Sequence, residues 1–159
     1  MSATGSVPLL YIVFSRFPQS SFVLAGRKEP VLEYKLSTIQ RVLWDLNIPP
    51  AYLGAHYLAY AELLVLEDQN RLTMVTKWLY PEVASHYHTS WQAVERNIRT
   101  VIAICWAQDG GEKLANLAGC TFARKPSPTR MIQALACYLM QMPDTFWQCE
   151  STTLVSSLS

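Results

Sequence analysis

The sequence predicts a mainly α-helical protein, a bundle of about six helices that contains a helix-turn-helix and carries a short N-terminal β-hairpin or strand extension. Three features support this fold class. The chain has 159 residues, of which 50% are hydrophobic and 16% charged, enough to bury one sizeable core. Apolar residues recur at spacings of three and four from residue 36 onward. Prolines and glycines separate these periodic segments, as they do where helices end.

Residues 1–35 differ from the rest of the chain. The runs LLYIVFSRF and SFVLAG are rich in β-branched and aromatic residues and are separated by PQS, a pattern typical of a hairpin or of two short strands. Such a hairpin is marginally stable alone, so we expect it to pack on the following domain, on a partner or on a second copy. Residues 36–142 are predicted to form the helical domain. Residues 143–159 have little to bury and are predicted to form a flexible tail.

The helices follow one another along residues 36–142. The first is predicted from Leu36, with Ser37 or Thr38 as its N-cap, and it stops at the pair Pro49–Pro50. The segment AYLGAHYLAYAELLVLED is apolar nearly all round, so it is predicted to be the central, most buried helix, with Gly54 as a packing residue. The remaining helices are predicted at about 72–79, 81–87, 89–106, 110–119 and 129–142.

The stretch HTSWQAVERNIRTVIAICW, residues 88–106, predicts a strongly amphipathic helix. Thr89 is its predicted N-cap, and Gln92, three residues later, completes a capping box. One face is apolar, and it consists of Val94, Ile98, Val101, Ile102 and Cys105. The opposite face is polar, and it consists of Gln92, Glu95, Arg96 and Arg99.

The helices PEVASHY and 89–106, joined by the tight turn SHYHTS, are typical of a helix-turn-helix. The second helix of that motif enters the major groove of DNA, with its N-terminal residues against the base edges. Arg is the side chain that best reads guanine, and Gln can read adenine, so the polar face is a candidate base-reading surface. The simpler alternative is a solvated helix face on which Glu95 and Arg99 form an ordinary ion pair.

The net charge of +1 argues against a strongly basic nucleic-acid binder, but the charge is unevenly distributed. Residues 71–135 carry eight Lys and Arg against four Asp and Glu, whereas residues 1–70 carry five against six. Positive charge therefore gathers around the predicted helix-turn-helix.

Several classes of protein are not expected from this sequence. No apolar run approaches the roughly 20 residues that cross a bilayer, and no Lys or Arg precedes the first apolar run, so we expect a cytoplasmic protein without a membrane partner. The four cysteines are 15, 17 and 12 residues apart, unlike zinc ligands, and we expect no metal or other cofactor. There is no Gly-rich phosphate loop, nucleophile elbow or metal pair. Hence neither an enzyme nor a small-molecule substrate is expected.

From about Ile39 to Leu139 the chain resembles a known family. The matching stretches are WLYPEVASHYHTSWQAVERNIRTVIAICW, then NLAG, then the turn at Lys125 and Pro126. They resemble the C-terminal effector domain of the sporulation initiation master regulator, stage zero sporulation protein A, of endospore-forming bacteria. The resemblance implies a bacterial, winged-helix-like domain of about six helices. It also implies binding to a short promoter box in double-stranded DNA, as a homodimer or as tandem copies, to activate or repress transcription.

The resemblance also implies roles for individual residues. Arg96 would pair with a guanine, and Glu95 would accept from a cytosine amino group or orient Arg96. The full set of residues that it assigns to DNA is Thr89, Ser90, Gln92, Glu95, Arg96, Arg99 and Lys125. Thr89 and Ser90 would meet phosphates through hydroxyl and backbone N–H groups, with Arg99 close to the backbone.

The chain departs from the family pattern in ways that affect binding. It has Ser85, His86 and Ala93 where the family has basic residues, so weaker binding or a different box is expected. The family carries a phospho-accepting receiver domain upstream. Residues 1–35 contain no Asp, so phosphorylation of such a domain is not expected here. A second hypothesis therefore stays open, in which the chain is a degenerate paralogue that acts by protein–protein contact on a full-length regulator.

Overall fold

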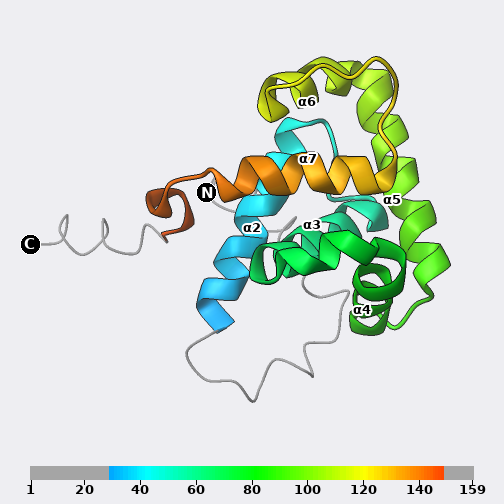
Figure 1. Cartoon of the computed structure of the whole chain (residues 1–159), viewed down its shortest axis with the longest axis vertical. Helices are drawn as coiled ribbons and strands as arrows, with labels where there is room; N and C mark the ends of the chain where they lie inside the picture. The colour runs from blue at the N-terminus through cyan, green and yellow to red at the C-terminus, as the bar shows by residue number, and fades with distance from the viewer. Residues whose placement is uncertain (1–28, 149–159) are drawn as a thin grey trace, which may run out of the picture. The chain divides into compact units, whose positions relative to one another are not determined.

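The computed structural model describes residues 29–148 of the chain. The chain divides into two units, Met1–Glu33 and Tyr34–Ser159. The elements below belong to the second unit, apart from the start of the first helix. Six α-helices, α2 to α7, account for most of the described residues, which contain no strand (Figure 1). The predicted mainly α-helical class is confirmed.

Helix α2 spans Glu29–Asp45 and begins earlier than predicted. Ser37 or Thr38 is the predicted N-cap, but both residues lie inside the helix. Their hydroxyls donate to the carbonyl oxygen of Tyr34, each at 2.8 Å, so they bond to the preceding turn and open no new helix. The predicted cap was therefore wrong.

The predicted N-terminal hairpin falls mostly on residues 1–28, which lie outside the described residues. The part of that extension which the structure describes, residues 29–35, is helical and does not support a strand. Pro30 stands in the first turn of α2, where a proline costs no intrahelical hydrogen bond.

Helix α3 (Leu53–Glu67) is the central helix that its apolar sequence predicts. Eleven of its fifteen residues are buried, and it packs against both α5 (Trp91–Cys105) and α7 (Pro128–Met140), which also touch each other. Figure 1 shows α5 running past the ends of both other helices. The core of the second unit therefore lies between α3, α5 and α7.

The segment before the helix-turn-helix differs from the prediction of two separate helices. A 3₁₀ segment, η3 (Gln69–Met74), leads into a π-helical turn, η4 (Val75–Leu79), which continues directly into α4 (Tyr80–His86). Pro81 lies in the first turn of α4, as predicted. The backbone N–H of Tyr80 bonds to the carbonyl oxygen of Val75, five residues back, so the π turn joins the two predicted helices into one stretch.

The last elements follow the prediction closely. A kinked segment, η5 (Trp106–Gly110), in which Gln108 and Asp109 have non-helical backbone angles, links α5 to α6 (Gly111–Ala118). Gly119 ends α6 with a φ of 66°. Ser127 caps α7. A 3₁₀ turn, η6 (Asp144–Trp147), lies within the segment predicted as a tail, and residues 149–159 lie outside the described residues.

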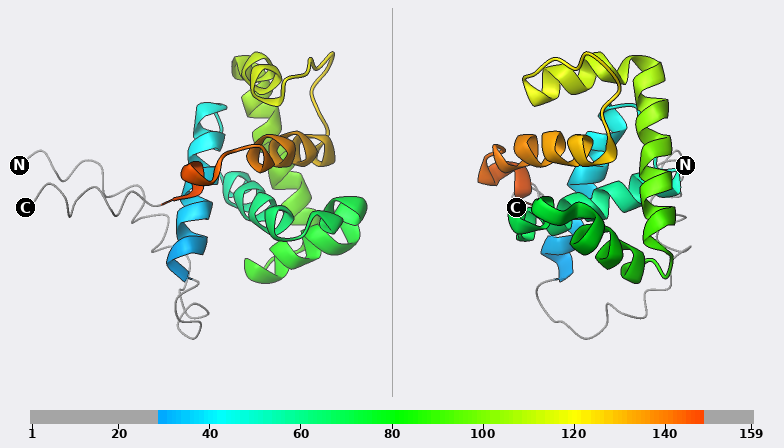
Figure 2. Two further views of the ribbon diagram at one scale, coloured as in Figure 1. Left: turned by 60° about the vertical axis from the view of Figure 1, so that its left-hand side comes forward. Right: turned by 45° about the vertical axis from the view of Figure 1, so that its right-hand side comes forward.

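The views in Figure 2 place α4 and the start of α5 at one end of the second unit and α6 at the other. No helix within residues 29–148 is long and apolar enough to cross a membrane.

Candidate nucleic-acid interface

Helices α4 and α5 form the predicted helix-turn-helix, and the turn between them is closed by backbone hydrogen bonds. The N–H of Thr89 donates to the carbonyl oxygen of Ala84 at 2.9 Å, and that of His88 donates to Ser85 at 3.3 Å. This pair of bonds is a Schellman motif, which requires one residue in the left-handed region. His88 is that residue, with a φ of 53°. The end of α4 is therefore tightly defined without a glycine.

The N-cap of α5 is Ser90, one residue later than predicted. The Ser90 hydroxyl accepts from the backbone N–H of Ala93 at 3.2 Å, and the extended backbone of Ser90 suits a cap. The predicted capping box of Thr89 and Gln92 was wrong, because the Thr89 N–H is already used to close α4. Gln92 is thereby released from a capping role and lies exposed on the first turn of α5.

The apolar face of α5 is buried as predicted: its buried residues are Val94, Ile98, Val101, Ile102 and Cys105. Gly54 of α3 lies against this helix at its midpoint. A Cβ at Gly54 would stand 2.1 Å from the carbonyl oxygen of Asn97 and 2.9 Å from a methyl of Val101. Only glycine allows α3 and α5 to approach so closely, which confirms its predicted packing role.

A second contact holds α4 to the scaffold. Arg71, in η3, donates to the carbonyl oxygen of Leu64 in α3 at 2.6 Å and to the carboxylate of Glu82 in α4 at 3.1 Å. Since one guanidinium bridges both helices, it ties the first helix of the motif to the central helix. The two helices of the motif are thus each fixed to α3 by a separate contact.

The polar face of α5 is largely exposed. Gln92, Arg96 and Arg99 are exposed and Glu95 is half-buried. Glu95 and Arg99 form an ion pair, as the simpler alternative predicts. Arg96 has no ion pair or side-chain hydrogen bond within residues 29–148, so its guanidinium is open to an outside acceptor. Of the turn residues, Ser90 is exposed and Thr89 half-buried.

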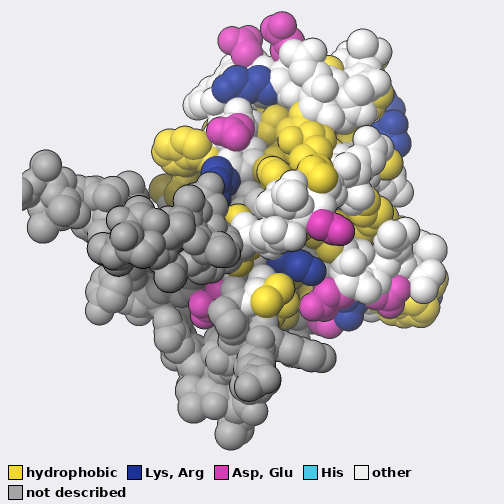
Figure 3. Space-filling model, turned by 90° about the vertical axis from the view of Figure 1, so that its left-hand side faces the viewer, with side chains coloured by type: hydrophobic (Ala, Val, Ile, Leu, Met, Phe, Trp, Pro, Cys, Tyr) yellow, Lys and Arg dark blue, Asp and Glu magenta, His cyan; other side chains and the backbone are white. Residues whose placement is uncertain are grey.

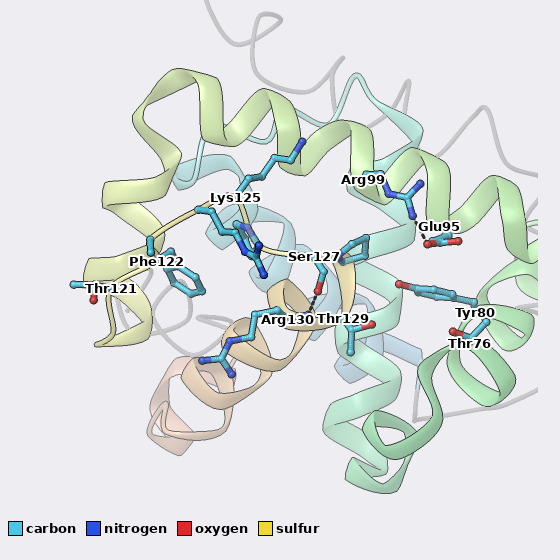
Figure 4. Close-up of a pocket in the computed structure, with 14 residues that line it drawn as sticks. Thr76, Tyr80, Glu95, Arg99, Thr121, Phe122, Lys125, Ser127, Thr129 and Arg130 are labelled. Atoms are coloured by element: carbon cyan, nitrogen blue, oxygen red, sulfur yellow. Dashed lines mark hydrogen bonds and ion pairs between the residues drawn. The ribbon is translucent and has the colours of Figure 1, made fainter.

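A groove of about 760 Å³ runs beside this face (Figure 4). One wall comes from Glu95 and Arg99 of α5 together with Thr76 and Tyr80, and the other from the loop before α7 and its first turn. The second wall consists of Thr121, Phe122, Ala123, Arg124, Lys125, Pro126, Ser127, Pro128, Thr129 and Arg130. Lys125, predicted as a DNA contact, is therefore brought to the same groove as Glu95 and Arg99.

Four cations and one carboxylate line the groove. Arg124 and Arg130 were not predicted as site residues, although the segment RKPSPTR contains three basic residues around the Ser127 cap. Burial, followed by the nearby Glu95 carboxylate, raises the pKa of Tyr80 to about 12, so its hydroxyl stays neutral. By contrast, the face in Figure 3, on the side of α2, shows acidic and basic side chains intermingled.

Other chemical centres are not apparent within the described part of the chain. No group of three His, Cys, Asp or Glu residues there could hold a metal ion. His56 lies in the core with its Nε2 2.7 Å from the carbonyl oxygen of Pro50, and His86 stacks on Tyr60 with ring centroids 4.0 Å apart. Cys105 is buried, and burial raises its pKa to about 11. These groups are explained by packing.

Residues 39–139 match the model of the protein family described as "Sporulation initiation factor Spo0A C terminal". The match covers well over half of the chain and runs from the middle of α2 to the end of α7. The resemblance noted between about Ile39 and Leu139 is thereby confirmed.

Proposed function

The chain belongs to this family of sporulation initiation factor C-terminal domains, which are DNA-binding effector domains of transcription regulators and not enzymes, and on that premise we propose that it is a sequence-specific transcriptional regulator. It reads a short promoter box in double-stranded DNA by placing α5 in the major groove. It binds as a homodimer or as tandem copies on adjacent boxes.

The exposed guanidinium of Arg96 carries the proposal. It projects from a helix whose opposite face is buried and whose N-terminus is fixed by the Ser90 cap, so the backbone that carries it is positioned before DNA binds. An Arg on the first turns of such a helix suits bidentate pairing with guanine O6 and N7. Gln92, freed from capping, stands one turn earlier on the same face and is available for an adenine.

The neighbouring residues take supporting roles. Glu95 accepts from a cytosine amino group, at the expense of its pair with Arg99. The backbone N–H groups of the first turn of α5, together with the hydroxyls of Thr89 and Ser90, meet a phosphate. Lys125 and Arg99 contact the backbone from the groove side.

A second function is favoured by a different observation. Trp78 is 53% exposed on η4 and Trp44 is 58% exposed on α2, and large exposed aromatic side chains are typical of protein interfaces. In this alternative the chain acts as a protein–protein interaction module that modulates a full-length regulator. DNA would then be bound weakly or not at all.

Selection of bound sequences from a random duplex pool with the purified chain separates the two functions. A regulator enriches one box, whereas an interaction module enriches none. The Arg96→Ala variant should then lose roughly tenfold or more in affinity for the enriched duplex, because a bidentate guanine contact is worth about 1–3 kcal/mol. Arg41→Ala, which removes an exposed cation on α2, is the matched control and should bind within about twofold of the unmodified chain. Equal affinity of Arg96→Ala and the unmodified chain would exclude the base-reading role.

A further inference from the structure

We propose that the groove between α5 and the loop before α7 binds the sugar–phosphate backbone of one DNA strand, and that Arg124 and Arg130 are phosphate-binding residues. This inference rests on the proposed function, because it concerns the same duplex. It assigns a second contact surface, which holds the strand beside the box and reads no bases.

The charge of the groove supports a polyanionic occupant. Its walls carry Arg99, Arg124, Lys125 and Arg130 against the single carboxylate of Glu95. That carboxylate is already paired with Arg99. Within residues 29–148, no carboxylate forms an ion pair with Arg124, Lys125 or Arg130. Three positive charges are therefore uncompensated and concentrated on one side of α5.

The distribution of charge around α5 favours a backbone contact in the groove. A helix in the major groove is flanked by the two phosphate backbones of the duplex. Helix α4 provides Glu82 and no Lys or Arg, and η4 before it provides Lys77 alone. In the groove, the loop and the first turn of α7 provide three cations that form no ion pair within the described residues. A strand that lies along the groove therefore meets the larger cluster of uncompensated positive charge.

The groove wall is preorganised. Pro126 and Pro128 are buried and fix the backbone on both sides of Ser127, whose hydroxyl accepts from the Arg130 N–H at 3.3 Å. Figure 4 shows Arg130 leaving the first turn of α7 and Lys125 in the loop before it. The N-terminal dipole of the 13-residue helix α7 adds positive potential at the same place. A phosphate thus meets cations that are carried on a backbone constrained by two buried prolines and a helix cap.

The test uses the full chain and two duplexes, the one enriched by selection and a scrambled duplex of equal length. Each phosphate contact contributes about 0.9 to the slope of log affinity against log salt. The double variant Arg124→Gln, Arg130→Gln should therefore lower that slope by about 1.8. Both duplexes should lose affinity by the same factor, leaving their ratio unchanged. The matched control is Lys35→Gln, Arg41→Gln on α2, which should keep the full slope.

The outcomes of this experiment distinguish the phosphate-binding groove from the regulator proposal on which it rests. If the unmodified chain binds but the groove variant keeps its slope, the phosphate role is wrong and the regulator proposal stands. A loss confined to the enriched duplex would mean that the groove reads bases, which also overturns the inference. If the variant binds DNA normally but loses binding to a polyglutamate peptide, the occupant is an acidic protein segment and the phosphate assignment is wrong. If no duplex binds the unmodified chain, the regulator proposal fails, and this inference fails with it.

Discussion

Gly54 of α3 lies directly against the carbonyl oxygen of Asn97 in α5, with no space between them for a side chain. The contact falls in the middle of the candidate base-reading helix, beside the buried Val101. It sets how deeply α5 sits on the central helix, and hence how far its polar face projects. A residue remote from DNA thereby controls the position of those that are proposed to touch it.

Substitution of this glycine should push the two helices apart. A methyl group in Gly54→Ala would stand 2.1 Å from backbone that cannot swing away, so we expect a loss of about 1–3 kcal/mol in the free energy of unfolding. Urea denaturation measures it. The control is Asn116→Ala, at an exposed position of α6, which should change stability by less than about 0.5 kcal/mol. If Gly54→Ala left the urea midpoint unchanged, α5 would be able to move away from α3 without loss of stability.

The sequence predicts the part of this architecture that rests on local pattern. The buried face of α5 can be predicted from apolar spacing alone, and the end of α6 can be predicted from Gly119. The cap of α5 was misplaced by one residue because Thr89 and Ser90 are both common N-cap residues. In the structure the Ser90 hydroxyl accepts from the Ala93 N–H, and the Schellman turn uses the Thr89 N–H that Gln92 would need for a capping box. The hydrogen bonds of the turn between α4 and α5 therefore fix the position of the cap, which residue preference alone does not.

The groove is harder to predict from the sequence than the helices are. Arg99 and Arg124 are 25 positions apart, and they line one groove only because α7 folds back against α3 and α5. A basic turn can be seen in RKPSPTR, but its partner wall cannot. Lys125 was predicted through family resemblance, whereas Arg124 and Arg130 required the fold.

The Schellman turn predicts opposite effects for two substitutions at one position. His88 has a φ of 53°, which costs a side-chain-bearing residue about 1 kcal/mol relative to glycine, and more for a β-branched residue. His88→Gly should therefore raise the melting temperature and His88→Val should lower it. Thermal unfolding followed by circular dichroism measures both. If both variants had the same melting temperature, the backbone of His88 would not be under strain.

The ion pair of Glu95 and Arg99 predicts a change in DNA specificity. In Glu95→Gln the groove loses its only carboxylate and Arg99 loses its partner. Affinity for a scrambled duplex should rise, with a salt slope larger by about 1, because Arg99 becomes available to a phosphate. The ratio of enriched to scrambled affinity should fall. Helix stability should change by only about 0.3–0.5 kcal/mol, since the pair is exposed to solvent.

Fluorescence anisotropy at several salt concentrations measures the slope and the ratio together. Glu112→Gln, at an exposed position on α6, removes one negative charge outside the groove and serves as the control. If the control raised scrambled-duplex affinity as much as Glu95→Gln did, net charge alone would explain the effect and the position of Glu95 would be irrelevant.

Glu62 makes the stability of the fold depend on pH. It lies on α3 with no exposed surface, and within the described residues neither of its carboxylate oxygens has a hydrogen-bond partner. Burial raises its pKa well above the ordinary value, so it is protonated in the folded protein when it is already ionised in the unfolded chain. Below pH about 4 both states are protonated and the group contributes no pH dependence.

As the pH rises above about 4, the unfolded chain releases the Glu62 proton and the folded chain keeps it. Stability then falls by up to about 1.4 kcal/mol per pH unit until the folded pKa is reached. Glu62→Gln keeps the size of the side chain but cannot ionise, so its stability relative to the unmodified chain should grow as the pH rises above about 5. Urea denaturation at each pH measures the difference, with Glu112→Gln as an exposed control whose difference stays flat. A constant difference for Glu62→Gln would mean that the buried carboxyl ionises in the folded protein as readily as in the unfolded one, which its burial without a partner argues against.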